Sequence, residues 1–228
     1  MLFRSETDTQ DISGKILKEC PVRVSPSEVE SCIAGFLGRQ QQIPPMYSAL
    51  KVQGKKLYEL AREGIEIERQ PRPVTFYEIK ILSMELPFVR FSVTCSKGTY
   101  IRTLCHDIGA KLGCMGCMES LVRTQVERFS ITDSLKLSQI EALVQEGKID
   151  EKIVSVEEMF SNYPAFFAQP HFDKMLQNGN PIPYKDQSLG ERVRMYTSSG
   201  VFIGIYEWNT SRQQYKPLTI FCTPQDFQ

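Results

Sequence analysis

Residues 97–104 (KGTYIRTL) bring together side chains that could bind an anion or a nucleotide. The sequence predicts a strand that ends at Cys95, a turn at Lys97, and then a helix whose free N–H groups favour negative charge. Arg102 is permanently charged and can donate two parallel hydrogen bonds to a carboxylate or phosphate. Tyr100 can stack and form hydrogen bonds. The segment is also compatible with an ordinary helix start that has an exposed Lys97 and a core Tyr100, and the residues alone favour neither interpretation.

Cys114 and Cys117 form a C-x-x-C pair, which could bind zinc or carry redox chemistry. Zinc needs four ligands, and the further candidates are Cys95, Cys105 and His106. Cys105 and His106 are neighbours on one expected helix, where side chains point about 100° apart. A redox pair begins a helix, which lowers the thiol pKa, whereas this pair follows the end of one. We therefore predict structural thiols, with a zinc or redox site as the weaker alternative.

The two histidines, His106 and His171, suggest no nucleophilic triad, because neither has a supporting Ser or Cys context. We expect His106, which precedes Asp107 on a helix, to be structural or on the surface. The sequence also has no glycine-rich loop of the kind that holds phosphates.

The composition is that of an ordinary globular protein of 228 residues, with 41% hydrophobic and 24% charged residues. Seven Cys is an odd number, which argues against a complete disulfide framework. The start turns polar at once, and no apolar run approaches the ~18 residues that span a bilayer. We expect a cytoplasmic protein with free thiols.

The 27 basic and 27 acidic residues balance, but they are unevenly distributed. Residues 89–128 are mainly basic, and residues 133–160 are mainly acidic. The basic stretch could form a phosphate-binding face. A solvated mixture of charges is the alternative, and charge alone favours it.

Hydrophobic spacing and turn residues predict an α+β fold with a largely antiparallel sheet flanked by helices, followed by a small, mostly β domain. We place the first domain at residues 1–160 and the second at 161–228, after an aromatic, proline-containing connection at 160–170. Helices are expected at 25–37, 55–62, 100–112, 137–145 and 172–176, and strands at 74–84, 88–95, 122–131, 192–196, 201–208 and 215–221.

KGTYIRTL resembles the active-site strand-to-helix motif of the TruB-type tRNA pseudouridine synthases. Further blocks of the chain are similar to the same family, in the family's order, from about Thr7 to Phe221. Chance similarity does not explain several long blocks in order. The blocks are TDTQDISG (7–14), IPPMYSALKVQGKKLYELAREG (43–64), RPV (72–74), LGC (112–114), SLVRT (120–124), GVFIG (200–204) and KPL (216–218).

The resemblance implies an isomerase that converts the T-loop uridine of tRNA (tRNA position 55) to pseudouridine without a metal or organic cofactor. It implies a pseudouridine synthase-like sheet and a PUA-like, RNA-binding C-terminal domain. The expected partner is the T-arm stem-loop of tRNA, with no membrane and no known protein partner. The target base must leave its stack, as in other base-modifying enzymes.

The resemblance also implies residue roles. Arg102 would pair with the catalytic aspartate, and Tyr100 would form hydrogen bonds within the same site. Leu121 would pack on the flipped base. The remaining residues predicted to bind substrate or RNA are Lys51, Tyr47, Lys97 and Arg123.

The sequence departs from the family at its nucleophile, because it contains no G-x-L-D-P-x-A-x-G motif. The base-stacking Tyr expected upstream of TDTQDISG is also absent. Asp8, Asp11 and Asp107 match no catalytic motif, and Asp8 and Asp11 are interpreted as turn formers.

Three explanations for this departure remain open: a gene fragment, a start codon assigned too far downstream, or a partner chain that supplies the rest. We favour the start codon. The 228 residues alone are expected to be inactive and to expose a sheet edge and core surface. A non-catalytic RNA-binding remnant is the alternative function.

Overall fold

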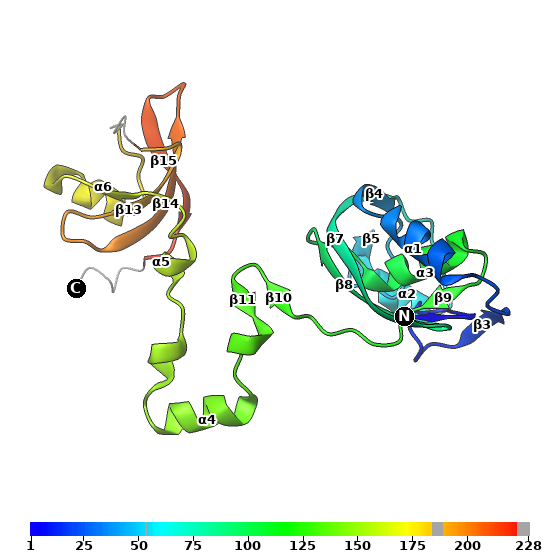
Figure 1. Cartoon of the computed structure of the whole chain (residues 1–228). Helices are drawn as coiled ribbons and strands as arrows, with labels where there is room; N and C mark the ends of the chain where they lie inside the picture. Colours follow the sequence, from blue (N-terminus) through cyan, green and yellow to red (C-terminus); the bar gives the residue numbers. More distant parts are fainter. Residues whose placement is uncertain (53, 184–188, 223–228) are drawn as a thin grey trace. The chain divides into compact units, whose positions relative to one another are not determined.

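The computed structural model describes residues 1–52, 54–183 and 189–222, and the chain forms two compact units, Met1–Thr132 and Asp133–Gln228 (Figure 1). The compact units divide at Thr132. The functional boundary that the sequence predicts at residue 160 stays a prediction.

Unit 1 is built on a five-stranded antiparallel sheet with the strand order β4-β7-β8-β1-β9. Its centre is a long hairpin of β7 and β8, which confirms the strands predicted at 74–84 and 88–95. The two strands are rich in β-branched and aromatic residues, which favour a pleated, half-buried surface. The strands are β1 (Leu2–Phe3), β4 (Gly38–Gln42), β7 (Arg72–Glu85), β8 (Phe88–Cys95) and β9 (Gly116–Cys117).

Helices α1 (Pro26–Ala34) and α3 (Ile101–Lys111) bury their apolar side chains in the core that the sheet forms. The Ser25 hydroxyl accepts from the Glu28 N–H, and the Glu28 carboxylate accepts from the Ser25 N–H, so α1 begins with a complete capping box. The predicted helices at 25–37 and 100–112 are confirmed. The core residues that the two helices contribute include Val29, Ile33, Leu104 and Ile108.

A second, smaller core in unit 1 lies under α2 (Leu57–Arg62), where Leu57 and Leu60 pack with Met46. This core joins α2 to the proline-containing loop at 43–50. The helix predicted at 55–62 is confirmed, with its first two residues in strand β6 (Lys55–Lys56), which pairs with β5 (Lys51–Val52).

Two further hairpins complete unit 1: β2 (Ser5–Thr7) with β3 (Ile16–Glu19), and β10 (Gln125–Val126) with β11 (Phe129–Ser130). The single strand predicted at 122–131 is wrong. The chain reverses at Glu127, whose φ is +50°, so that Val126 pairs with Phe129. The apolar pattern on both sides of the reversal resembled one continuous strand.

Unit 2 contains a four-stranded sheet with the order β12-β13-β14-β15. The three predicted strands are confirmed as β13 (Arg192–Tyr196), β14 (Phe202–Asn209) and β15 (Gln214–Ile220). Strand β12 (Ala165–Phe167) pairs in parallel with β13, so the prediction of a simple connection at 160–170 is wrong at this point. Its own core contains Leu176, Val193, Met195, Ile203, Tyr206 and Tyr215.

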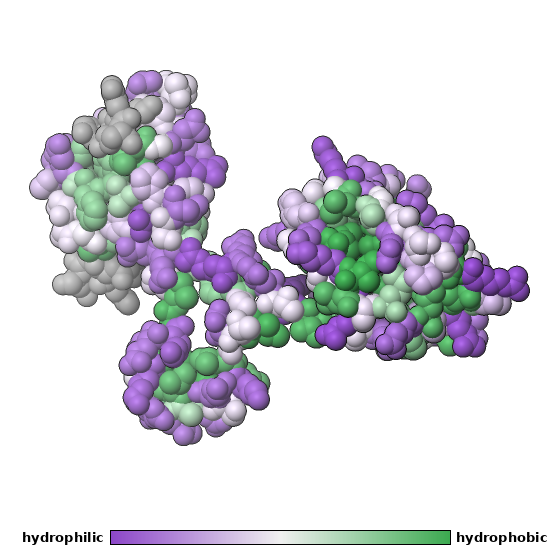
Figure 2. All heavy atoms as spheres, in the orientation of Figure 1, coloured by the Kyte–Doolittle hydropathy of each residue, from purple (hydrophilic) through white to green (hydrophobic). Residues whose placement is uncertain are grey.

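Short helices precede and flank this sheet: α4 (Leu137–Gln145), α5 (Val156–Met159) and α6 (Asp173–Gln177), with single 3₁₀ turns at Ile131–Asp133, Ile149–Lys152 and Pro170–Phe172. The helices predicted at 137–145 and 172–176 are confirmed. Apolar side chains gather on the surface of α4 (Figure 2), where Leu137 is 85% exposed and Val144 is 56% exposed.

Across the ranges that the structure describes, no helix is both long enough and apolar enough to cross a bilayer.

Candidate functional site

The start of α3 has the strand–turn–helix geometry that the sequence predicts. Strand β8 ends at Cys95, and Gly98 takes a φ of +84°, which a glycine adopts without a steric penalty. Tyr100 is the N-cap residue of α3 and has an extended backbone. Arg102 and Thr103 therefore lie in the first turn of the helix, on rigid secondary structure.

Arg102 is half-buried, and its guanidinium connects two distant segments of the chain. Nη2 donates to the Tyr47 carbonyl oxygen at 2.7 Å, and Nη1 donates to the Thr9 carbonyl oxygen at 3.4 Å. Among the acids that the structure describes, none forms an ion pair with Arg102. A guanidinium has five N–H donors, so it retains capacity for an anion.

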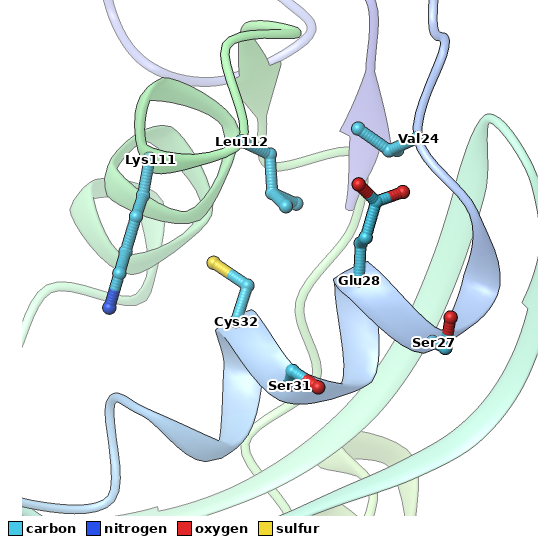
Figure 3. Close-up of a pocket in the computed structure, with 7 residues that line it drawn as sticks. All are labelled: Val24, Ser27, Glu28, Ser31, Cys32, Lys111 and Leu112. Atoms are coloured by element: carbon cyan, nitrogen blue, oxygen red, sulfur yellow. The ribbon is translucent and has the colours of Figure 1, made fainter.

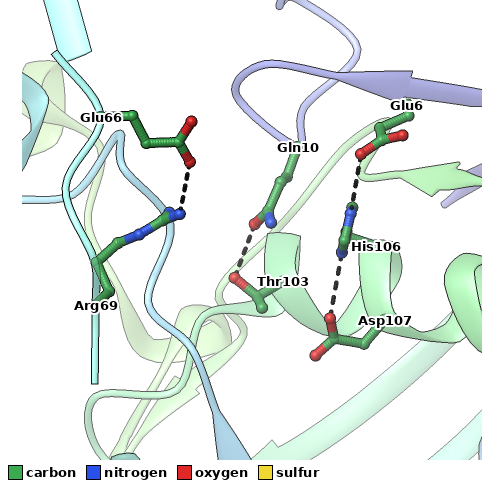
Figure 4. A network of polar contacts seen from close by, with 7 residues as sticks. All are labelled: Glu6, Gln10, Glu66, Arg69, Thr103, His106 and Asp107. Carbon is green, nitrogen blue, oxygen red and sulfur yellow. Dashed lines mark hydrogen bonds and ion pairs between the residues drawn. The ribbon is translucent and has the colours of Figure 1, made fainter. Parts of the chain in front are cut away.

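Gln42, at the end of β4, and Gln10, in the 7–14 turn, add further links to α3. The Gln42 side chain accepts from the Tyr100 N–H at 2.8 Å and donates to the Tyr100 carbonyl oxygen at 3.0 Å. The Thr103 hydroxyl donates to the Gln10 side-chain oxygen at 2.8 Å (Figure 4). Gln42 and Thr103 are almost fully buried. Blocks 7–14, 43–50 and 97–104, which are separate in the sequence, therefore meet at the first turn of α3.

Residues outside the first turn of α3 also bind the 43–50 loop. Arg69 donates from Nη1 to the Pro44 carbonyl oxygen at 3.3 Å and pairs with Glu66 at 2.9 Å (Figure 4). The Tyr58 N–H in α2 donates to the Ser48 carbonyl oxygen at 3.1 Å. The prolines remove backbone donors from this loop, so its carbonyl oxygens are what the surrounding donors bind.

The predicted site residues fall into two groups. Arg102, Tyr100 and Tyr47 lie together, through the contacts just described, and all three are half-buried. Lys51 on β5 and Lys97 in the turn before α3 are exposed.

Leu121 is 57% exposed, and Arg123 is exposed in the same segment after β9. The contacts found in the described part of the chain do not bring either residue to Arg102. Their roles stay predictions.

The acids near the site have partners of their own. Asp8 accepts from the Lys15 N–H at 2.8 Å, and Asp11 accepts from the Ser13 N–H at 3.0 Å. Both carboxylates close the turn at 7–14, which confirms the interpretation of Asp8 and Asp11 as turn formers.

His106 of α3 lies between the carboxylates of Asp107 and Glu6. Its Nδ1 is 3.2 Å from Asp107 Oδ1, and its Nε2 is 3.3 Å from Glu6 Oε1 (Figure 4). The hydrogen bond with Asp107, and to a smaller extent that with Glu6, raises the pKa of His106 above its ordinary value, although partial burial opposes this. His106 thus joins α3 to β2, as expected of a histidine that is structural or on the surface.

The cysteines of the C-x-x-C pair are buried in the core of unit 1. Burial raises the pKa of Cys114 to about 11 and that of Cys105 to about 12, and it also raises the pKa of Cys117. A thiol of this kind is not a reactive thiolate at neutral pH. Within the described residues, no group of three potential His, Cys, Asp or Glu ligands is found. Both side chains pack in the core, and the prediction that they are structural thiols stays a prediction.

Two surface hollows lie away from the first turn of α3. One lies between α1 and the end of α3 (Figure 3), where Cys32 donates to the Ile108 carbonyl oxygen at 3.9 Å. The other is lined by Arg4, Glu19, Cys20, Pro21, Val22, Leu86 and Pro87. Neither lining includes a residue that the sequence predicts for the site.

Sequence reasoning missed Gln10, Gln42 and Thr103. Neutral amide and hydroxyl side chains carry no signal of their own, because the same residue types are common on any surface. The one available signal for Gln42 was its place directly before the proline-containing loop.

The fold resembles that of chains in solved structures of a Cbf5-containing complex and an H/ACA RNP. The chain superposes on the structure described as "Crystal Structure of a Cbf5-Nop10-Gar1 Complex" with a TM-score of 0.63 and 20% identity, covering 90% of this chain and 65% of that one. A second structure, "Structure of H/ACA RNP bound to a substrate RNA containing 2'-deoxyuridine", gives a TM-score of 0.59 and 16% identity, covering 89% of this chain and 63% of that one.

The model of the TruB family pseudouridylate synthase N-terminal domain matches residues 1–101, and that of the tRNA pseudouridylate synthase B C-terminal domain matches residues 102–161. The tRNA pseudouridine synthase B of Clostridium novyi is 43% identical, covering 87% of this chain and 69% of that protein. The protein of the same name from Bacillus subtilis is 38% identical, covering 88% of this chain and 68% of that protein. The chain belongs to the TruB family of tRNA pseudouridine synthases.

Proposed function

We propose that this chain forms the substrate pocket in which the T-loop uridine of tRNA is isomerised to pseudouridine. The observation that carries the proposal is the position of Arg102, held by the Tyr47 and Thr9 carbonyl oxygens where three family-like blocks meet. Carbonyl oxygens orient a guanidinium but do not neutralise it, so the remaining donors favour an anion. A reacting carboxylate beside Arg102 fits this requirement.

The reaction breaks the glycosidic bond, turns the uracil and rejoins it to the ribose through carbon. Arg102 would hold the carboxylate in place, and Tyr100 would form a hydrogen bond in the same pocket. The target base must leave the stacked loop to reach these groups, and Leu121 would pack on it. We infer that the carboxylate is none of Asp8, Asp11 and Asp107, because each of these acids has a local partner.

RNA binding in this proposal depends on exposed, positively charged side chains that can contact phosphates. Lys51 is exposed on β5, directly after the 43–50 loop, Lys97 is exposed in the turn before α3, and Arg123 is exposed further along the chain. Side chains of this kind bind the RNA backbone and make affinity depend on salt. The proposal places the activity in the cytoplasm, with the T-arm stem-loop as the partner and no cofactor.

The test is tritium release from a T-arm stem-loop RNA labelled at uridine C5. We expect no release from the 228 residues alone and release from an upstream-extended chain that carries a G-x-L-D motif. In the extended chain, Arg102→Ala should lower kcat/KM by roughly 100-fold or more, because the reacting carboxylate loses its charge partner. Arg102→Lys keeps the positive charge but cannot donate two parallel hydrogen bonds to a carboxylate, so it should recover little of the lost activity.

The matched control is Arg90→Ala, which removes an exposed arginine from β8 and should leave kcat/KM unchanged. An Arg102→Ala enzyme as active as the parent would refute the role of Arg102. If no extended form releases tritium, but the chain binds the RNA with a steep salt dependence, the chain is a non-catalytic RNA binder instead.

A further inference from the structure

We infer that Gln42 is a positioning residue, which holds the backbone of Tyr100 and thereby fixes the first turn of α3 in the reacting pocket. The inference rests on the proposed function, because it concerns the same pocket. Gln42 is 4% exposed, and its side-chain amide makes two hydrogen bonds with one residue, to the Tyr100 N–H at 2.8 Å and to its carbonyl oxygen at 3.0 Å.

This pair of bonds is specific to a primary amide. The Tyr100 N–H needs an acceptor, and the Tyr100 carbonyl oxygen, which accepts from the Leu104 N–H at 3.1 Å, has a second lone pair for another donor. Glutamine supplies one acceptor and one donor in a single plane. Tyr100 is the N-cap residue of α3, and Gln42 accepts from its N–H as the third-residue side chain of a capping box would.

The position of Gln42 in the chain connects its contact with Tyr100 to the 43–50 loop. Gln42 is the last residue of β4, where it pairs with Arg72 of the central hairpin, and it directly precedes the 43–50 loop. The same loop contributes the Tyr47 carbonyl oxygen that binds Arg102. Two links, Gln42 with Tyr100 and Arg102 with Tyr47, therefore hold loop 43–50 against the first turn of α3.

A small rotation of that turn would displace both Tyr100 and Arg102. Since both are proposed to act on the reacting groups, the loss of Gln42 should reduce the rate of the chemical step more than the affinity for RNA. A reacting group misplaced by a fraction of an ångström lowers kcat, whereas backbone contacts made by Lys51 and Lys97 are unchanged.

The experiment compares Gln42→Met, Gln42→Glu and the control Gln41→Met in the upstream-extended chain. Gln41 is the adjacent glutamine and is exposed. We expect Gln42→Met to lower kcat for tritium release roughly tenfold with KM for the T-arm RNA within about twofold of the parent. The Gln41→Met enzyme should match the parent in both constants.

Gln42→Glu separates positioning from simple core packing. Its ionised carboxylate can accept from the Tyr100 N–H but cannot donate to the Tyr100 carbonyl oxygen. Its protonated form regains a donor. The kcat of this variant, relative to the parent, should therefore rise as the pH is lowered, whereas that of Gln42→Met should keep a constant ratio.

Hydrogen exchange of the Tyr100 amide tests whether Gln42 holds the Tyr100 backbone, and this measurement needs no catalytic turnover. Protection of this amide should be lost in Gln42→Met and kept in Gln41→Met, while the Leu104 amide stays protected in both. An unchanged Tyr100 amide, or an equal effect on kcat and KM, would overturn the inference. If the parent enzyme releases no tritium, the proposed function fails, and the exchange data still decide whether Gln42 holds Tyr100.

Discussion

Arg102 shows how a single charged residue can be oriented by neutral partners. Its guanidinium lies at the meeting point of three segments, and the oxygens that bind it are backbone carbonyls rather than side chains. Backbone acceptors cannot be lost by mutation of their own residue. The orientation of Arg102 therefore depends on the paths of the 7–14 turn and the 43–50 loop, and less on which side chains those segments carry.

The sequence predicted part of the candidate site and not the rest. Arg102 and Tyr100 were predicted from their place in KGTYIRTL at an expected helix start and from the resemblance of that segment to the family, because the residue types alone left an ordinary helix start equally open. Gln42 and Thr103 were not, because their function lies in contacts with residues 58 and 93 positions away. Spacing within a sequence contains no information on such a contact until the fold brings the segments together.

His106 should make the stability of unit 1 depend on pH. Its raised pKa means that the folded state binds the proton more tightly than the unfolded state. The stabilisation is therefore complete below the ordinary histidine pKa and is lost as the pH rises through the higher folded value. The free energy of unfolding of the parent relative to His106→Gln should fall across that window, by less than about 1 kcal/mol for a partly exposed pair.

The control for this measurement is His171→Gln, which replaces the exposed second histidine in unit 2. Chemical denaturation at several pH values, followed by a probe in unit 1, provides the measurement. A difference that grows with rising pH would contradict the assignment of Asp107 and Glu6 as the partners of His106.

At the scale of elements, local signals predicted the helices and the long hairpin well. Capping residues and apolar spacing located α1 and α3, and alternation located β7 and β8, because each element satisfies its own backbone hydrogen bonds or those of its immediate neighbour. The misses, β12 and the β10–β11 reversal, have a different cause. β12 pairs with β13 about 30 residues later. The sequence of a three-residue segment contains no pattern that predicts a parallel partner at that distance.

Gly109 sets the distance between α3 and β9. A Cβ at this position would lie 2.3 Å from backbone atoms of Met115 and Gly116, which cannot move without moving the strand. We expect Gly109→Ala to lower the free energy of unfolding of unit 1 by about 1–3 kcal/mol, although alanine favours a helix. Denaturant titration measures this.

The neighbouring exposed Ala110, changed to Ser, is the matched control and should have little effect. The same displacement of α3 should also reduce the protection of the Tyr100 amide. A Gly109→Ala protein as stable as the parent would show that α3 can move away from β9 at low cost.

At the scale of the whole molecule, the chain has separate hydrophobic cores in its two units. Leu104 is buried in unit 1, and Leu176 is buried in unit 2. Each core contains apolar residues that come only from its own unit. The two units therefore have the means to unfold as separate cooperative transitions.

Leu176→Ala should destabilise unit 2 by roughly 2–5 kcal/mol and leave the transition of unit 1 unchanged. Leu104→Ala should do the reverse. Native-state hydrogen exchange, read separately for amides of β13 and β7, distinguishes the two effects. Equal losses of protection in both units from either substitution would mean that the chain unfolds as one cooperative body.

The thiols of the core have a consequence for how the folded chain meets oxidants and electrophiles. Cys32, Cys105, Cys114 and Cys117 are buried in unit 1, whereas Cys20, Cys95 and Cys222 are half-exposed. A reagent in solution therefore meets three partly exposed cysteines on the native protein, although seven are present in the sequence. The four buried cysteines become available only when unit 1 unfolds, so the extent to which an alkylating reagent modifies them reports how often unit 1 unfolds.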